Sequence, residues 1–229
     1  MDLTNIAPTA GFARKTRAAA IAALIGLSAG AFASPPAFAA TAPDTAAATD
    51  IASRIAAHFS AVKSMTGQFV QFGPHGEQTG GTFYIARPGK LRFNYDKPSP
   101  IQVVCDGNSI VINNKKLDTW NLYPLSKTPL RLLLADNIDL SGGKVESVAQ
   151  GQDLTTVVLG DKSIFGNSKI TMMFDAKTYE LRQWTITDAQ GLDTTVMIYN
   201  VKSGVAFDPN LFAIDYRRVS QSTGNDVHR

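Results

Sequence analysis

The sequence predicts a mainly β protein, built from one long antiparallel sheet with helices against its concave side. From Gly67 onward the apolar residues recur with a period of two, which is typical of strands. The turns between these segments are short and contain glycine, so most neighbours along the chain pair antiparallel. A sheet of roughly eleven strands accumulates twist and curls toward a barrel. A plain sandwich with helices at one edge is the alternative that periodicity leaves open.

The first 39 residues predict an export signal rather than part of the fold. Three basic residues precede the short apolar run Ala18 to Ala33, and Ala37-Phe38-Ala39 resembles a cleavage site. No cysteine follows the run, so we expect a soluble exported protein without a lipid anchor, cleaved between Ala39 and Ala40. Residues 40–49 are expected to form a flexible leader. The remainder fits one domain over residues 50–218, with a flexible tail at 219–229.

A helix is predicted over residues 50–65, just before the first strand. Ile51, Ile55, Phe59, Val62 and Met65 form one apolar stripe at helical spacing. Thr49 or Asp50 is the expected cap, and Gly67 the expected stop. This amphipathic helix needs an apolar surface to lie on.

The strands follow in an almost regular succession. Turn sequences at Gly73–Gly76, Asp106–Asn108 and Asp188–Gly191 separate several of them. We predict strands at 68–73, 78–86, 90–96, 101–106, 108–113, 117–123, 144–150, 153–160, 168–175, 180–188 and 192–201, and a final one near 212–217.

A short helix interrupts the strands at Ser126 to Asp136. Thr128 is the expected cap and Pro129 the first helical residue, after which Leu130, Leu133 and Leu134 share a face. Asp208-Pro209 repeats the cap-then-proline pattern and predicts a brief turn. The three leucines are too apolar for a helix that stands alone in water, so we place this helix on the concave side of the sheet.

Catalytic and metal-binding patterns are missing from the sequence. The three histidines have no metal-ligand spacing, and Cys105 is the only cysteine, set in an apolar run. Neither a Gly-x-Ser-x-Gly elbow nor a glycine-rich phosphate loop occurs. The formal net charge of +3 belongs partly to the export signal, and no basic block points to nucleic acid. We therefore expect no enzyme, no cofactor and no metal.

One strand joins an arginine to an apolar face. In RPGKLRFNYDKPSP, Leu91, Phe93 and Tyr95 alternate with polar residues, and Arg87 stands at the entrance beside a proline. An ordinary surface arginine at a strand end is the alternative interpretation of Arg87.

Three motifs together resemble the LolA family, the periplasmic carriers of outer-membrane lipoproteins. They are ARPGKLRFNYDKP (86–98), VVCDGNSIVI (103–112) and KTPLRLLLAD (127–136), supported by TGQFVQ (66–71) and ITDAQGLDTT (186–195). The resemblance runs from about Ile51 to Arg217.

The resemblance implies an incompletely closed antiparallel barrel of about eleven strands, covered by helices around a hydrophobic cavity. It implies a monomeric periplasmic chaperone, loaded with triacylated lipoproteins by an inner-membrane lipoprotein-releasing ABC transporter complex and unloaded by an outer-membrane lipoprotein acceptor. It also implies that Arg87 bonds backbone carbonyls of the lid and keeps the empty lid shut. A guanidinium suits this role, because its five donors form a rigid fork that can meet the free carbonyls at helix ends.

These implications give a hypothesis for the site. Leu130, Leu133 and Leu134 close against the sheet in the empty protein, and acyl chains displace them as the Arg87 contacts break. The expected walls, assigned by strand alternation, are Phe83, Ile85, Leu91, Phe93, Tyr95, Trp184 and Ile186. The alternative function is a periplasmic lipid- or partner-binding sensor of the same fold in envelope-stress regulation.

Overall fold

A computed structural model describes residues 45–138, 140, 145–163 and 166–225 of the chain. The expected export signal at 1–39 and the start of the expected leader lie outside these residues. These residues belong to the compact unit that follows residue 40.

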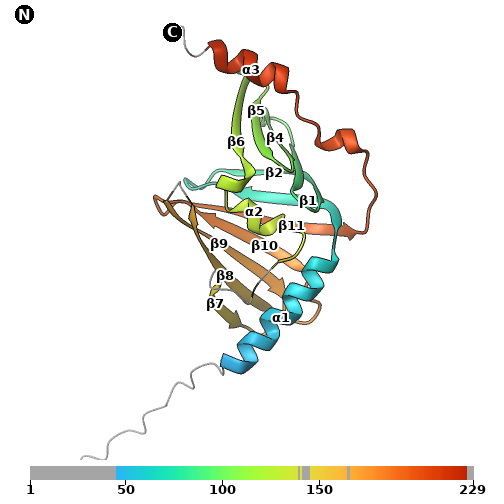
Figure 1. Cartoon of the computed structure of the whole chain (residues 1–229), viewed down its shortest axis with the longest axis vertical. Coiled ribbons are helices and arrows are strands. Elements are labelled where there is room, and N and C mark those ends of the chain that lie inside the picture. The colour runs from blue at the N-terminus through green and yellow to red at the C-terminus, as the bar shows by residue number, and fades with distance from the viewer. Residues whose placement is uncertain (1–44, 139, 141–144, 164–165, 226–229) are drawn as a thin grey trace, which may run out of the picture. The chain divides into compact units, whose positions relative to one another are not determined.

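Eleven strands form one antiparallel sheet whose two edges do not pair (Figure 1). The spatial order is β6-β5-β4-β3-β2-β1-β11-β10-β9-β8-β7, so β1 and β11 meet in the middle and β6 and β7 are the edges. This is the predicted unclosed sheet. The strands are β1 (Ser64–Phe72), β2 (Gln78–Ala86), β3 (Lys90–Tyr95), β4 (Ile101–Asp106), β5 (Ser109–Asn114), β6 (Thr119–Pro124), β7 (Val145–Gln150), β8 (Leu154–Ser163), β9 (Gly166–Asp175), β10 (Leu181–Thr187) and β11 (Asp193–Ser203).

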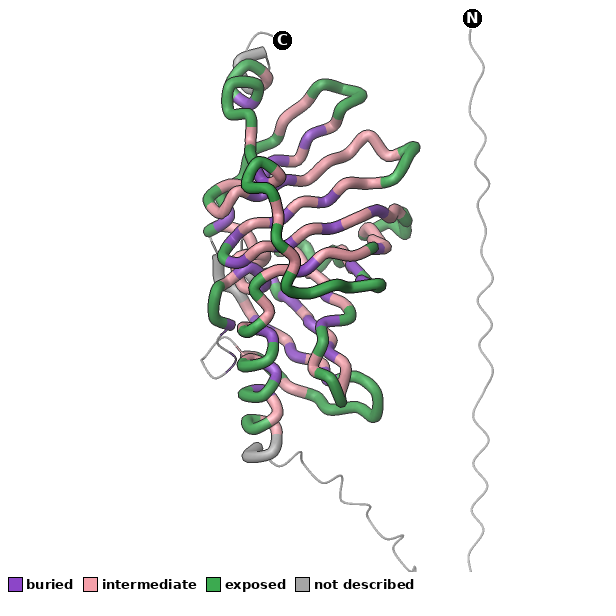
Figure 2. The backbone as a smooth tube through the Cα atoms, turned by 90° about the vertical axis from the view of Figure 1, so that its right-hand side faces the viewer, coloured by how far each residue is buried: buried purple, intermediate pink, exposed green. Residues whose placement is uncertain are grey.

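Side-chain alternation decides which face of the sheet is buried. In β3, Leu91 and Phe93 are buried while Arg92 and Asn94 remain partly exposed. Figure 2 shows buried and less buried positions alternating along the strands, with exposed residues at the hairpin tips. Gly81 in β2 permits this packing, because a Cβ there would lie 2.0 Å from the Asn94 carbonyl oxygen. In β3 the buried row, Leu91 and Phe93, belongs to the apolar cluster that includes residues of α1 and α2.

Helix α1 (Thr45–Ala61) lies against this buried face. Ile55 and Phe59 are buried, as the predicted stripe requires. The predicted bounds were wrong at both ends. The helix begins within the expected leader, where alanines favour helix. It ends at Ala61, because the chain from Ser64 already pairs with β2, so Gly67 lies within a strand and does not stop the helix.

The inserted segment forms a 3-10 turn, η1 (Leu125–Lys127), and then the one-turn helix α2 (Leu130–Leu133). Its position was predicted, but Thr128 is not the cap. The Thr128 hydroxyl donates backward to the Leu125 carbonyl at 3.0 Å, and no side-chain cap bond precedes α2. Thr128 therefore ends the first turn instead of beginning the second.

The C-terminal segment differs most from the prediction. The expected strand near 212–217 is instead a 3-10 turn, η2 (Pro209–Phe212), followed by helix α3 (Tyr216–Asn225), which occupies most of the expected flexible tail. The Asp208 side chain caps η2 by accepting from the Asn210 amide, as predicted.

This segment packs on the outer face of the sheet, away from α1 and α2 (Figure 1). Arg92 donates to the Leu211 carbonyl at 2.8 Å, and the Tyr216 hydroxyl bonds Asp106 at 2.7 Å. Phe212 of η2 and Val219 of α3 are the buried side chains of this segment. The segment is helical because its few apolar residues pack on the outer face of the sheet, a contact that the local sequence does not indicate.

Candidate functional site: an arginine at two helix ends and the apolar face beneath

Arg87 connects the ends of the two helices that cover the sheet. Its Nε donates to the Leu133 carbonyl at 3.3 Å, and its Nη1 donates to the Phe59 carbonyl at 2.8 Å and to the Val62 carbonyl. Leu133 ends α2, whereas Phe59 and Val62 lie at the end of α1. The carbonyls of a last helical turn lack partners within the helix and carry partial negative charge, so a cation is favourable there.

Burial shapes the electrostatics of this arginine. Arg87 is 8% exposed, and its guanidinium carbon lies 3.9 Å from the centre of the Phe59 ring. Burial lowers the pKa of Arg87 to about 10, and the charge of nearby Asp136 opposes that shift. The side chain thus stays charged at neutral pH. Its Nη2 is buried without a hydrogen-bond partner among the described residues.

Backbone and side-chain bonds hold the same corner together. The Arg87 amide donates to the Lys63 carbonyl at 2.7 Å, and the Gly89 amide to the Leu134 carbonyl at 2.8 Å. Gly89 has a φ of 77°, a conformation that glycine adopts without strain. Lys63 also pairs with Asp136 at 2.8 Å. The turn between β2 and β3 is therefore fixed to both helices and to the segment after α2.

The ten predicted wall and lid residues gather in one apolar cluster. Those on the sheet come from β2, β3 and β10, and those on the lid from α2 and its end. Buried members are Phe83, Ile85, Leu91, Phe93, Trp184, Leu133 and Leu134; the half-buried Tyr95, Leu130 and Ile186 pack against them.

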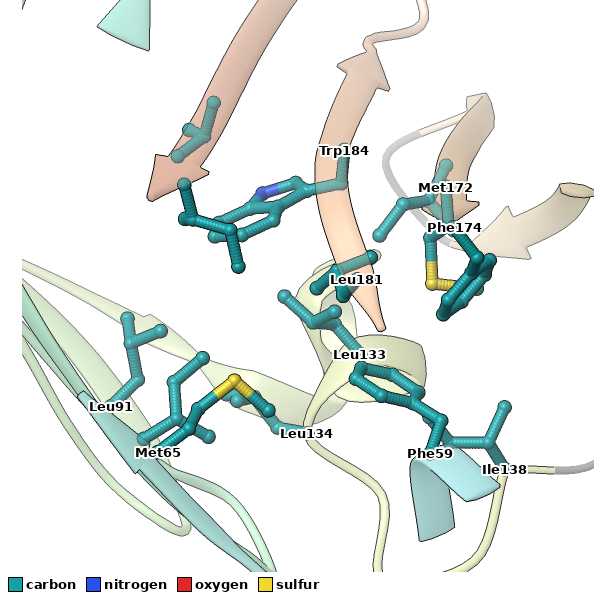
Figure 3. Close-up of a cluster of buried hydrophobic side chains, with 14 of the residues drawn as sticks. Phe59, Met65, Leu91, Leu133, Leu134, Ile138, Met172, Phe174, Leu181 and Trp184 are labelled. Carbon is teal, nitrogen blue, oxygen red and sulfur yellow. The ribbon is translucent and has the colours of Figure 1, made fainter. Parts of the chain in front are cut away.

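The lid leucines fill the space over the sheet. Leu133 and Leu134 are 0% and 1% exposed. Figure 3 shows Leu133 pointing toward Leu181 and Trp184 of β10, with Phe59 of α1 nearby. This face of the sheet is thus covered by the protein's own side chains.

Aromatic contacts line the sheet side of this cluster. The Phe93 and Trp184 rings stack with centres 6.2 Å apart and planes 14° apart, and Phe69 lies 4.7 Å from Phe93. The Tyr95 hydroxyl donates to Gln71 at 2.7 Å. Burial raises the pKa of Tyr95 to about 12. Large aromatic side chains therefore form the sheet side of the cluster that α2 covers.

Sequence reasoning missed several members of this site. Phe69, Met172, Phe174 and Leu181 are buried in the cluster, yet they were not assigned as walls. Their strands were predicted, and strand alternation alone could have proposed them. Phe59 was placed on the apolar stripe of the first helix, but nothing in the sequence indicated its ring beneath Arg87.

A pocket of about 200 Å³ opens beside the Arg87 corner. Phe59, Met65 and Leu181 of the apolar cluster line it, with His58, Glu180 and Arg182 among the polar lining residues. The cluster is therefore reachable from the surface at this end of the sheet.

Two observations on the described residues concern metal and thiol chemistry. These residues contain no group of three His, Cys, Asp or Glu side chains placed to hold a metal ion. Cys105 is fully buried, and burial raises the pKa of its thiol to about 11, so the nucleophilic thiolate is scarce at neutral pH. Of the helices formed by these residues, none has the length and apolar character needed to cross a bilayer.

Comparisons with known proteins show which family the sequence resembles. A family model described as outer membrane lipoprotein carrier protein LolA matches residues 60–215. An outer-membrane lipoprotein carrier protein of Methylococcus capsulatus is 25% identical over 169 residues, covering 70% of this chain and 81% of the relative. One of Chromobacterium violaceum is 29% identical over 142 residues, covering 60% and 68%.

A solved LolA superfamily protein from Nitrosomonas europaea aligns with a TM-score of 0.40 at 10% identity, covering 72% of this chain and 98% of that one. The family model spans well over half of the sequence. The chain therefore belongs to the LolA family of outer membrane lipoprotein carrier proteins.

Proposed function

We propose that this protein is a periplasmic chaperone that binds the acyl chains of lipoproteins released from the inner membrane and carries them to the outer membrane. An inner-membrane lipoprotein-releasing ABC transporter complex would load it, and an outer-membrane lipoprotein acceptor would unload it. The family membership supports the lipoprotein as cargo. The observation that carries the mechanism is the apolar face closed by Leu133 and Leu134, with Arg87 bonded to both covering helices.

The energetics require an enclosed site for such cargo. Removing an acyl chain from water stabilises it by about 0.8 kcal/mol per methylene, so a chain of roughly fifteen gains about 12 kcal/mol. An acylated protein cannot cross an aqueous space with these chains exposed. The buried aromatic and aliphatic face of β2, β3 and β10 offers the chains an apolar environment.

Release of the cargo requires that another free-energy term offset part of the energy gained by burying the acyl chains. Opening the site for cargo moves or exposes Leu133 and Leu134. Each buried leucine contributes about 1.5–3 kcal/mol to the stability of the closed state. Opening also breaks the Arg87 bonds to Phe59, Val62 and Leu133. Both losses are recovered when the empty lid closes again. The closed lid therefore competes with the cargo and makes delivery favourable once an acceptor is present.

Replacing Arg87 tests this mechanism. Arg87→Leu removes the contacts at both helix ends, so we expect the variant to accept lipoprotein but to transfer it to an acceptor at least about tenfold more slowly. Transfer from purified, loaded protein to acceptor-containing membranes measures this rate. Arg92→Leu is the matched control, because Arg92 also donates to a carbonyl but on the outer face.

The control should transfer at the wild-type rate. If Arg87→Leu delivers its cargo as fast as the wild type, the latch mechanism is wrong. If the purified protein binds no acylated peptide at all, the carrier function itself is wrong.

A further inference from the structure

A second pocket lies at the beginning of α2, at the opposite end of that helix from Arg87. Its volume is about 310 Å³. Thr128 and Pro129 line it on the lid side, and Ser168, Ile186 and the turn after β10 line it on the sheet side. Ile186 also packs against the apolar cluster, so the pocket borders the site proposed for acyl chains.

Ser168 is the polar exception on an inward-facing row. In β9 the buried side chains alternate as Ser168, Ile170, Met172 and Phe174, and the last three belong to the apolar cluster. Ser168 is 6% exposed, and its hydroxyl has no hydrogen-bond partner among the described residues. A buried hydroxyl without a partner destabilises the folded state, so its presence at the pocket calls for an acceptor.

The charges at the pocket favour an uncharged acceptor. Lys127 and Asp188 both line it, so neither sign of charge dominates. Asp188 already accepts the amides of Gln190 and Leu192, each at 2.9 Å. An anionic headgroup would meet this carboxylate, whereas a neutral carbonyl attached to an alkyl chain would match both the hydroxyl and the apolar wall.

We propose that this pocket holds the glycerol end of a diacylglycerol anchor, with the Ser168 hydroxyl donating to an ester carbonyl oxygen. The acyl chain would continue inward along Ile170 and Met172 after the lid leucines move. This inference rests on the proposed carrier function and adds a polar recognition site to it. The position of the anchor in the site would then depend on the glycerol esters as well as on the acyl chains.

An ester-to-ether comparison tests the hydrogen bond. The probe is a synthetic peptide whose N-terminal cysteine carries a dipalmitoylglyceryl thioether, and its partner is the dialkyl ether analogue, which lacks both carbonyl oxygens. We expect wild-type protein to bind the ester about fivefold more tightly. Ser168→Ala should bind the two peptides equally. Titration calorimetry measures all four affinities.

Thr155→Val is the matched control. Thr155 is 0% exposed on β8, and its hydroxyl also has no partner among the described residues, but it is not a lining residue of this pocket. The control should keep the preference for the ester. Loss of the preference in Thr155→Val, or an equal effect of Ser168→Ala on both peptides, would overturn the proposal.

Two further outcomes separate the possible errors. Wild-type protein that binds both peptides equally contradicts the ester site but leaves the carrier function standing, whereas binding of neither contradicts the carrier function. Dipalmitoylphosphatidylcholine and its dialkyl ether carry the same linkages on a phospholipid. A Ser168-dependent ester preference for the phospholipid alone would assign the pocket to membrane lipid and overturn its assignment to the lipoprotein anchor.

Discussion

The position of Arg87 could be recognised in the sequence, but its hydrogen-bond partners could not. Its place before a strand with an apolar face was visible, and the family resemblance implied contacts with lid carbonyls. The structure supplies the acceptors, which are the carbonyls of Leu133, Phe59 and Val62. Contacts with chain separations of 25 to 46 residues leave no local pattern, so the acceptors could not have been read from the sequence.

Cys105 gives a prediction at the same scale. Its pKa is raised from 9.0 to about 11 by burial, so the native state keeps the proton that the unfolded state loses above pH 9. The stabilising effect is complete below pH 9 and is lost as the pH rises toward 11. We expect the free energy of unfolding to fall more steeply over this range in the wild type than in Cys105→Ala, measured by urea unfolding. Parallel curves for the two proteins would contradict the burial of this thiol.

At the scale of elements, the strands and the apolar stripe of α1 were predictable because periodicity records them directly. Caps and ends were less so. Thr128 was expected to begin α2, but its hydroxyl turns back to Leu125. The start of β1 at Ser64 ended α1 early, since pairing with β2 competes with the helix for the same residues. At the ends of α1 and α2, contacts with other parts of the chain thus outweigh the local helix signals.

Helix α3 offers a test of such a tertiary contact. Val219 is 6% exposed, and Ser222 accepts the Trp120 amide of edge strand β6 at 3.3 Å. Val219→Asp places a charge in this buried contact, so we expect α3 to detach and the stability to fall by about 1–3 kcal/mol. Hydrogen exchange should become fast throughout α3, while Arg218→Ala, at an exposed position, should leave it slow.

Binding of the lipopeptide should be unchanged in Val219→Asp, because α3 lies on the outer face. Slow exchange in α3 of this variant would contradict the described packing.

At the scale of the whole described unit, the sequence predicted an antiparallel sheet of about eleven strands with helices on one side. The sheet was predicted correctly because alternation marks the buried face and short turns mark the order of strands, whereas η2 and α3 lie on the other face and were not predicted there. Alternation does not say whether the edge strands pair with each other. The order from β6 to β7 shows that they do not, and α2 covers the sheet instead. Leu133 and Leu134 then pack within the apolar cluster on that face.

The central claim is that acyl chains replace the lid leucines on the face of the sheet that carries Trp184. The sequence has two tryptophans, and Trp184 is 1% exposed within the apolar cluster, so Trp120→Phe isolates its fluorescence. The most direct measurement is a titration of this variant with a lipopeptide that carries a quenching doxyl group midway along an acyl chain. We expect strong quenching that saturates at one lipopeptide per protein. Tight binding shown by calorimetry, with the Trp184 emission unchanged, would contradict it.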